Sequence, residues 1–179
     1  MSKIFEVNAI MLKRQPVFEA DCLFTILTRE QGRLLVKGRG VLKPLSKLSG
    51  GLLTAAHSRL RLTEGTIPTV TSAAPVRVFG ALMESPEKAR LAWTALEAVL
   101  RSTVEARPEP VLFDLLLRFL ENLDGAQEAD ENLVKVFLYQ QCEILGYGMP
   151  EPHERLSFSD VLHAFEYNFE RKLLTLDTI

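Results

Sequence analysis

The chain has 179 residues, with 21 lysine and arginine residues, 23 aspartate and glutamate residues and a formal net charge of −2 at pH 7. Hydrophobic residues make up 47% and charged residues 25%, values close to globular averages, which exclude a disordered or fibrous chain. The two cysteines, Cys22 and Cys142, are far apart in sequence, which argues against a disulfide framework and favours a reducing compartment. No apolar run approaches the roughly 18 residues of a membrane helix, and residues 1–12 do not resemble a signal peptide, so we expect a cytoplasmic protein.

Positive and negative charges are segregated along the chain. Residues 1–80 hold twelve cations and five acidic residues, a net charge of +7, whereas residues 81–179 hold nine cations and eighteen acidic residues, a net charge of −9. This asymmetry indicates that the first part meets a polyanion, while the second part keeps the chain soluble or meets a basic partner.

Residues 1–80 have the pattern of a small β domain. Five segments rich in Val, Ile, Leu, Thr and Phe, divided by Gly, Pro or Ser, predict strands over residues 3–14, 21–30, 33–39, 53–62 and 67–78. The EQGR sequence at residues 30–33 predicts a tight hairpin, with Gly32 at a positive φ angle. Five short strands favour a small barrel.

After Gly80 the apolar residues recur at helical spacing, so we place a domain boundary there, with domains over residues 1–80 and 81–179. Four helices are predicted, over residues 85–106, 109–125, 131–148 and 157–176. Ser85 is an expected N-cap, and Ser157 forms an expected capping box with Asp160. The expected fold class is therefore α+β, with a five-stranded β-barrel followed by an all-α bundle.

Residues 33–51 form a basic segment with five cations and four glycines, and no acidic residue occurs between Gln31 and Thr63. Alternation along a strand would place Arg33, Leu35, Lys37 and Arg39 on one face, and the same rule aligns His57, Arg59 and Arg61. With Lys43 and Lys47 in the connecting loop, these rows are expected to form a positive groove for a nucleic-acid backbone, which gains affinity through counterion release.

Two other features bear on this hypothesis. Cations on a small β domain can simply be solvated and protect sheet edges, but the whole acid-free run favours polyanion binding. Stacking on bases has little support, because the first 80 residues contain few aromatic residues, among them Phe5, Phe18 and Phe24. Phe24 is expected in the core, and Phe18, in a loop beside Pro16, is the better stacking candidate.

The order of these features resembles the bacterial recombination mediator and DNA repair protein RecO family. The resemblance rests on AIMLKR at residues 9–14, on Glu19-Ala20-Asp21, and on LFTILTREQGRLLVKGRG at residues 23–40. Later motifs are VLFDLLLRFLENLDG at 111–125, KVFLYQQCEILGYGMP at 135–150 and ERKLLTL at 170–176. The resemblance implies an N-terminal OB-fold followed by a helical domain.

The resemblance also implies a function in DNA repair and recombination. It implies binding of single- and double-stranded DNA, strand annealing, and help in loading RecA together with RecR, and with RecF in many bacteria. A further implied partner is the C-terminal tail of the single-stranded DNA-binding protein. That tail is acidic, so the acidic helical domain of this chain weakens the expectation.

Matched to the family by position, Arg29 joins the cations of the basic segment. The expected nucleic-acid-binding residues are Arg29, Arg33, Lys37, Arg39, Lys43, Lys47, Arg59 and Arg61. Many members carry a zinc-binding cysteine cluster before the closing helix, which this chain lacks. We therefore expect no metal and no cofactor.

The residues do not favour an enzyme. The three histidines have no catalytic context, Cys142 is expected in the core, and the glycines do not form a phosphate-binding loop. Glu19 and Asp21 could bind a metal but are more typical of solvated turn residues. Two alternatives stay open. The first is a protein adaptor whose basic barrel binds an acidic partner. The second is an RNA-binding OB-fold protein, because the sequence shows no feature that contacts a 2′-hydroxyl and so does not distinguish RNA from DNA.

Overall fold

The computed structural model describes residues 3–149 and 151–176. The chain divides into two compact units. One runs to Val78 and also includes Thr103–Phe113, and the other comprises Phe79–Ser102 and continues from Asp114. Within the described residues, no helix is long and apolar enough to cross a membrane.

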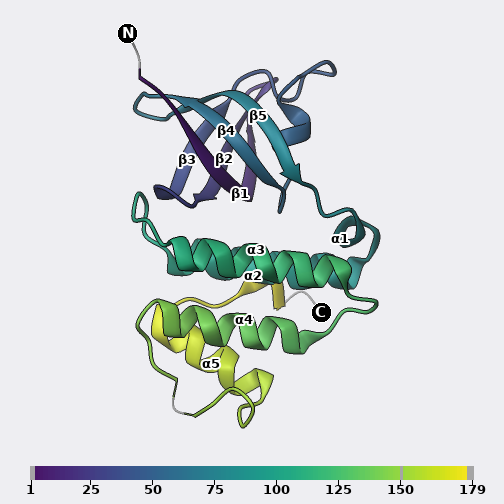
Figure 1. The fold of residues 1–179 in the computed structure, drawn as a ribbon, viewed down its shortest axis with the longest axis vertical. Helices are drawn as coiled ribbons and strands as arrows, with labels where there is room; N and C mark the ends of the chain where they lie inside the picture. The colour runs from purple at the N-terminus through teal and green to yellow at the C-terminus, as the bar shows by residue number, and fades with distance from the viewer. Residues whose placement is uncertain (1–2, 150, 177–179) are drawn as a thin grey trace. The chain divides into compact units, whose positions relative to one another are not determined.

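The five predicted strands are present, and they close into a barrel in the order β1-β2-β3-β5-β4 (Figure 1). Their bounds are β1 Ile4–Val17, β2 Asp21–Thr28, β3 Gly32–Gly38, β4 His57–Thr63 and β5 Thr69–Arg77. Neighbouring strands are antiparallel except β3 and β5, which pair in parallel at Lys37 and Thr69. The short 3-10 turn η1, Ser49–Gly51, lies between β3 and β4.

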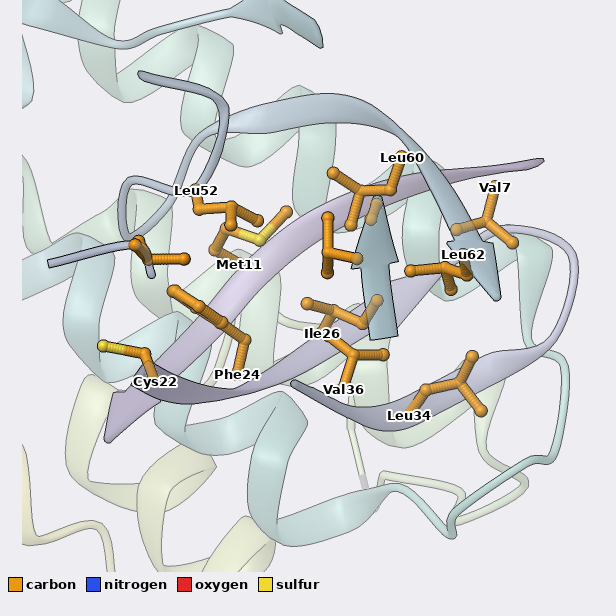
Figure 2. Close-up of a cluster of buried hydrophobic side chains, with 13 residues drawn as sticks. Val7, Met11, Cys22, Phe24, Ile26, Leu34, Val36, Leu52, Leu60 and Leu62 are labelled. Atoms are coloured by element: carbon orange, nitrogen blue, oxygen red, sulfur yellow. The ribbon is translucent and has the colours of Figure 1, made fainter. Parts of the chain in front are cut away.

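Alternate residues of the strands fill the barrel, as the pleat requires. Figure 2 shows these side chains pointing into a common interior. The buried cluster consists of Val7, Ala9, Met11, Cys22, Phe24, Ile26, Leu34, Val36, Val41, Leu52, Leu60, Leu62 and Val70. Full burial of one such Val, Leu, Ile, Phe or Met side chain stabilises the fold by about 1.5–3 kcal/mol. The expected core position of Phe24 is confirmed.

The β2–β3 turn has the predicted glycine conformation. Gly32 has a φ of 74°, in the left-handed region. The Thr28 hydroxyl donates to the Gly32 carbonyl at 2.9 Å and accepts from the Gln31 backbone N–H at 3.0 Å. The short loop and its glycine thus fix the register in which Thr28 pairs with Gly32.

Residues 103–113 pack with the barrel, although the sequence predicts a helix through residue 106 and places this segment in the second domain. Lys37 is the residue at which β3 pairs with β5, so the Arg33 carbonyl lies beyond that pairing. It accepts a hydrogen bond from the Ala106 N–H at 2.8 Å instead. The Arg33 carbonyl thus finds its hydrogen-bond partner in an extended segment that runs beside β3. The chain leaves the helical conformation to form this segment, and the preceding helix ends at Ser102.

The helices are α1 Gly80–Glu84, α2 Pro86–Ser102, α3 Pro110–Gly125, α4 Glu131–Ile144 and α5 Phe158–Phe169, with the 3-10 turn η2 at Leu174–Leu176 (Figure 1). The sequence does not predict α1. The expected capping box is confirmed: Ser157 Oγ accepts from the Asp160 N–H at 3.1 Å, and Asp160 Oδ2 accepts from the Ser157 N–H at 2.9 Å. The closing helix stops short of residue 176, because Glu170 adopts a left-handed φ of 51°.

The helical unit buries Cys142, as expected. Burial raises the pKa of this thiol to about 11, so it stays protonated at neutral pH and is a poor nucleophile. At the end of the described chain, Glu97 of α2 accepts hydrogen bonds from the backbone N–H groups of Leu174 and Thr175, at 3.1 and 2.9 Å. These bonds attach η2 to α2.

Candidate nucleic-acid interface

The two predicted rows of outward side chains are present on β3 and β4. On β3, Leu34 and Val36 are buried, while Arg33, Leu35 and Lys37 are half-exposed. On β4, Arg59 and Arg61 are exposed and alternate with buried residues. The period of two therefore assigned these cations to the correct face.

The two rows lie on strands that are not neighbours. Lys37 of β3 pairs with Thr69 of β5, and Thr69 pairs in turn with Thr63 of β4. The uncharged residues of β5 therefore separate the β3 cations from those of β4. The chain forms this order because β4 pairs with β1 to close the barrel, which leaves the last strand to fill the space next to β3.

Lys37 is paired with a carboxylate from another strand. Its Nζ lies 3.0 Å from Asp21 Oδ2, at the start of β2. Asp21 also accepts a hydrogen bond from the Gly40 N–H at 2.9 Å. The Gly40 N–H, followed by Lys37, holds the pKa of Asp21 below its usual range, so this carboxylate is ionised at neutral pH.

Arg61 is paired in the same way. Its Nη2 and Nε donate to Glu6 Oε1 at 2.8 and 3.1 Å, across the β1–β4 pairing. No acidic residue occurs between Gln31 and Thr63 along the chain, but two cations of this run, Lys37 and Arg61, meet carboxylates from other strands in the folded protein. The sequence contains both acids within or next to predicted strands, but only the strand register shows which cation each one meets.

The remaining predicted residues fall into separate places. Arg33 is half-buried beside residues 103–113, and its carbonyl is bonded to Ala106. Arg29 is exposed in the β2–β3 turn, at the end of β3 opposite Gly38. Neither lies at the end of the barrel that carries Arg39.

The loop after β3 carries several cations. Arg39, Lys43 and Lys47 are all exposed there. The loop is held against the β1–β2 turn, because the Leu42 N–H donates to the Ala20 carbonyl at 3.0 Å. Phe18 of that turn lies under Lys37, whose Nζ is 5.6 Å from the ring centroid. We call Phe18, Lys37, Arg39 and Lys43 the turn surface.

The sequence pattern misjudged the surroundings of Asp21. It is half-buried and joins the β1–β2 turn, β3 and the following loop, rather than being a solvated turn residue. Within the part of the chain that the structure describes, no group of three or more His, Cys, Asp or Glu side chains could hold a metal ion.

Two family models match nearly the whole chain. The model described as "Recombination protein O N terminal" matches residues 1–79, and "Recombination protein O C terminal" matches residues 83–158. The chain belongs to the RecO family. The first matched region of this RecO-family chain contains the whole turn surface, and the second contains α2, α3 and α4.

Curated relatives agree with this assignment. The chain is 34% identical over 146 residues to the DNA repair protein RecO of Pelotomaculum thermopropionicum, covering 81% of this chain and 56% of the relative. It is 32% identical over 151 residues to that of Dehalococcoides mccartyi, covering 84% and 59%. A third relative, from Heliobacterium modesticaldum, is 43% identical over 81 residues, which cover 45% of this chain and 30% of the relative. The RecO-family chain therefore spans less than two-thirds of the length of these relatives.

Proposed function

We propose that this chain is a non-enzymatic DNA repair and recombination mediator that binds single- and double-stranded DNA through the basic end of its barrel. The observation that carries the proposal is the exposed loop after β3. Its cations Arg39, Lys43 and Lys47 are exposed, and the loop begins directly after the end of β3 that carries Lys37. Phosphate contacts by such cations release condensed counterions and supply affinity that does not depend on base sequence.

The strand order supports an OB-fold as the architecture of this domain, which we place over residues 1–80. Its five strands form a closed sheet in the order β1-β2-β3-β5-β4, with the η1 turn between β3 and β4. OB-folds bind oligonucleotides on the face of strands 2 and 3 and with the loops between strands 1 and 2 and between strands 4 and 5. Of the turn surface, Phe18 belongs to the first of these loops and Lys37 to the adjoining end of β3, while Arg39 and Lys43 lie in the loop that follows β3.

Strand annealing needs no covalent step in this mechanism. Cations that track the sugar-phosphate backbone screen its charge and leave the base edges free to pair. Two complementary strands held at low mutual repulsion then anneal because base pairing releases free energy. With RecR, and with RecF, the same protein would assist the loading of RecA.

The helical unit, residues 81–179 in the sequence-based division, supplies the protein contacts in this proposal. A groove of about 320 Å³ opens between α3 and α4. It is lined by Leu115, Arg118, Phe119, Asn122, Leu133, Val136, Phe137 and Gln140. Apolar walls with the cation Arg118 are suited to the acidic C-terminal tail of the single-stranded DNA-binding protein, despite the net negative charge of the unit.

The proposal is tested by reversing charge in the exposed loop. In the variant Arg39→Glu with Lys43→Glu, affinity for a labelled single-stranded oligonucleotide should fall at least tenfold at low salt, as measured by fluorescence anisotropy. We avoid Lys37→Glu, because it would place two carboxylates against each other at Asp21 and disturb the turn. The matched control is Arg171→Glu with Lys172→Glu, the same change in net charge at two exposed residues of the helical unit.

Unchanged affinity in the loop variant, or equal loss in the control, would contradict DNA binding at this surface. Tight binding to an acidic protein with no binding to DNA would favour the adaptor. Preference for RNA over a DNA oligonucleotide of equal length would favour the RNA-binding alternative.

A further inference from the structure

Phe18 breaks two rules of protein structure at once. Its side chain is 85% exposed, although it is a large aromatic residue. Its backbone has a φ of 55°, in the left-handed region that bulky residues rarely adopt. Exposure means that packing does not compensate for the strain, and such uncompensated positions are typical of functional sites.

The surroundings fix where the ring points and what charge it meets. Lys37 lies over the ring with Nζ 5.6 Å from its centroid. Lys37 is itself held by Asp21 at 3.0 Å, and Asp21 holds the loop through the Gly40 N–H at 2.9 Å. An aromatic face is thus displayed at a fixed place beside Arg39 and Lys43, both exposed.

We propose that Phe18 is a stacking platform for an unpaired base, so that the turn surface recognises single strands through base contact as well as phosphate contact. This inference rests on the proposed function and adds its ligand class: a nucleic acid with unstacked bases. Every base has an aromatic face, so a stacked ring binds without reading sequence. The nearby exposed cations Arg39 and Lys43 supply the complementary charge for the flanking phosphates.

A purely structural role for Phe18 predicts a different behaviour. If the ring served to hold Lys37, replacing it would weaken the fold and reduce binding to every polyanion alike. If it serves to stack, replacing it should affect only ligands that offer a free base. Binding measurements with ligands that have free bases and ligands that lack them therefore distinguish the two roles.

The test variant is Phe18→Gly, because glycine adopts a positive φ without strain. Its thermal midpoint should equal or exceed that of the unchanged chain. Its affinity for single-stranded oligo(dT) should fall about fivefold to a hundredfold, the range that one base stacked on an aromatic ring contributes. The conservative variant Phe18→Tyr keeps the ring and should bind as the unchanged chain does.

Two further ligands make the test specific for stacking. An abasic oligonucleotide of equal length keeps the phosphates but has no bases, and the unchanged chain and Phe18→Gly should bind it equally. A blunt duplex, whose bases are already stacked, should also be bound equally by both. The matched protein control is Tyr167→Ala, which removes an aromatic ring that is 84% exposed on α5 and should leave all affinities unchanged.

A direct readout uses the single tryptophan of the chain. In a Trp93→Phe background, Phe18→Trp should lose fluorescence when oligo(dT) binds and keep it when the abasic oligonucleotide binds, because a stacked base quenches indole emission.

Some outcomes overturn the inference and leave the proposed function standing. If Phe18→Gly binds oligo(dT) like the unchanged chain, while Arg39→Glu with Lys43→Glu does not bind, then Phe18 does not stack. Equal loss on oligo(dT), duplex and abasic ligand would also overturn it, because the role would then be structural. If the unchanged chain binds none of these ligands at low salt, both proposals fail. Both proposals would also fail if the protein bound anionic lipid vesicles and no nucleic acid.

Discussion

Gly32 shows at the residue scale how the barrel and residues 103–113 depend on one another. Its φ of 74° requires a residue that tolerates the left-handed region, and a Cβ there would overlap the carbonyl group of Arg107. Gly40 is also left-handed, with a φ of 64°, but a Cβ there would meet only the side chain of Lys43 at 3.5 Å. Substitution at Gly40 therefore adds backbone strain alone, whereas substitution at Gly32 adds backbone strain and a steric clash.

We expect Gly40→Ala to lower the free energy of unfolding by about 1–2 kcal/mol, the strain of a left-handed alanine. Gly32→Ala should lower it by about 3 kcal/mol or more, because the backbone of residues 103–113 must also move. Urea unfolding measures both. Equal values for the two variants would show that residues 103–113 do not pack against the β2–β3 turn.

At the scale of elements, hydrophobic periodicity predicted the strands well, because apolar residues that face the interior alternate with polar residues that face solvent along a half-buried strand. The helix ends were less predictable. The helix predicted over residues 85–106 stops at Ser102 because Glu105 pairs with Arg33 of β3, and no local signal distinguishes residues 103–106 from one more helical turn. The shorter α5 depends likewise on the left-handed Glu170, a residue without glycine's preference for that conformation.

The α3–α4 groove carries a prediction at the same scale. Arg118 is an exposed cation among its lining residues, so Arg118→Glu should weaken binding of an acidic tail peptide at least tenfold by replacing attraction with repulsion. Fluorescence anisotropy with the labelled peptide measures this. Arg155→Glu, an equal charge change at another exposed residue of the helical unit, should leave affinity within about twofold if contact rather than net charge matters. Equal effects of the two variants would place the peptide elsewhere.

At the scale of the whole molecule, the charge segregation read from the sequence overstates the cations open to a polyanion. Asp21 and Glu6 meet Lys37 and Arg61 across strands, and Arg33 is half-buried. The eight predicted cations are thus distributed over both ends of β3 and over β4. They do not form one continuous row.

This distribution predicts the salt dependence of DNA binding. Lys37 is already paired with Asp21, so a single strand that follows the turn surface and its loop meets three exposed cations, Arg39, Lys43 and Lys47. The logarithm of affinity should then fall with the logarithm of salt concentration at a slope of about −2, from about −0.7 per phosphate contact. All eight predicted cations would give about −5.6. A salt series by anisotropy decides between them, and a slope shallower than about −1.5 would contradict phosphate binding at this end of the barrel.

The sequence by itself determined the strands and their inward faces, the glycine of the β2–β3 turn and the capping box at Ser157. It also placed the basic residues on the outer face. These are local properties, set by side-chain period and by backbone preferences within a few residues. Tertiary structure alone decided that β5 lies between β3 and β4, that residues 103–113 join the barrel, and that Asp21 holds Lys37 beside Phe18. Those features depend on the register between segments that are distant in sequence. The closed sheet determines which segment lies beside each strand, and that neighbour supplies the partners for its hydrogen-bonding groups and charges.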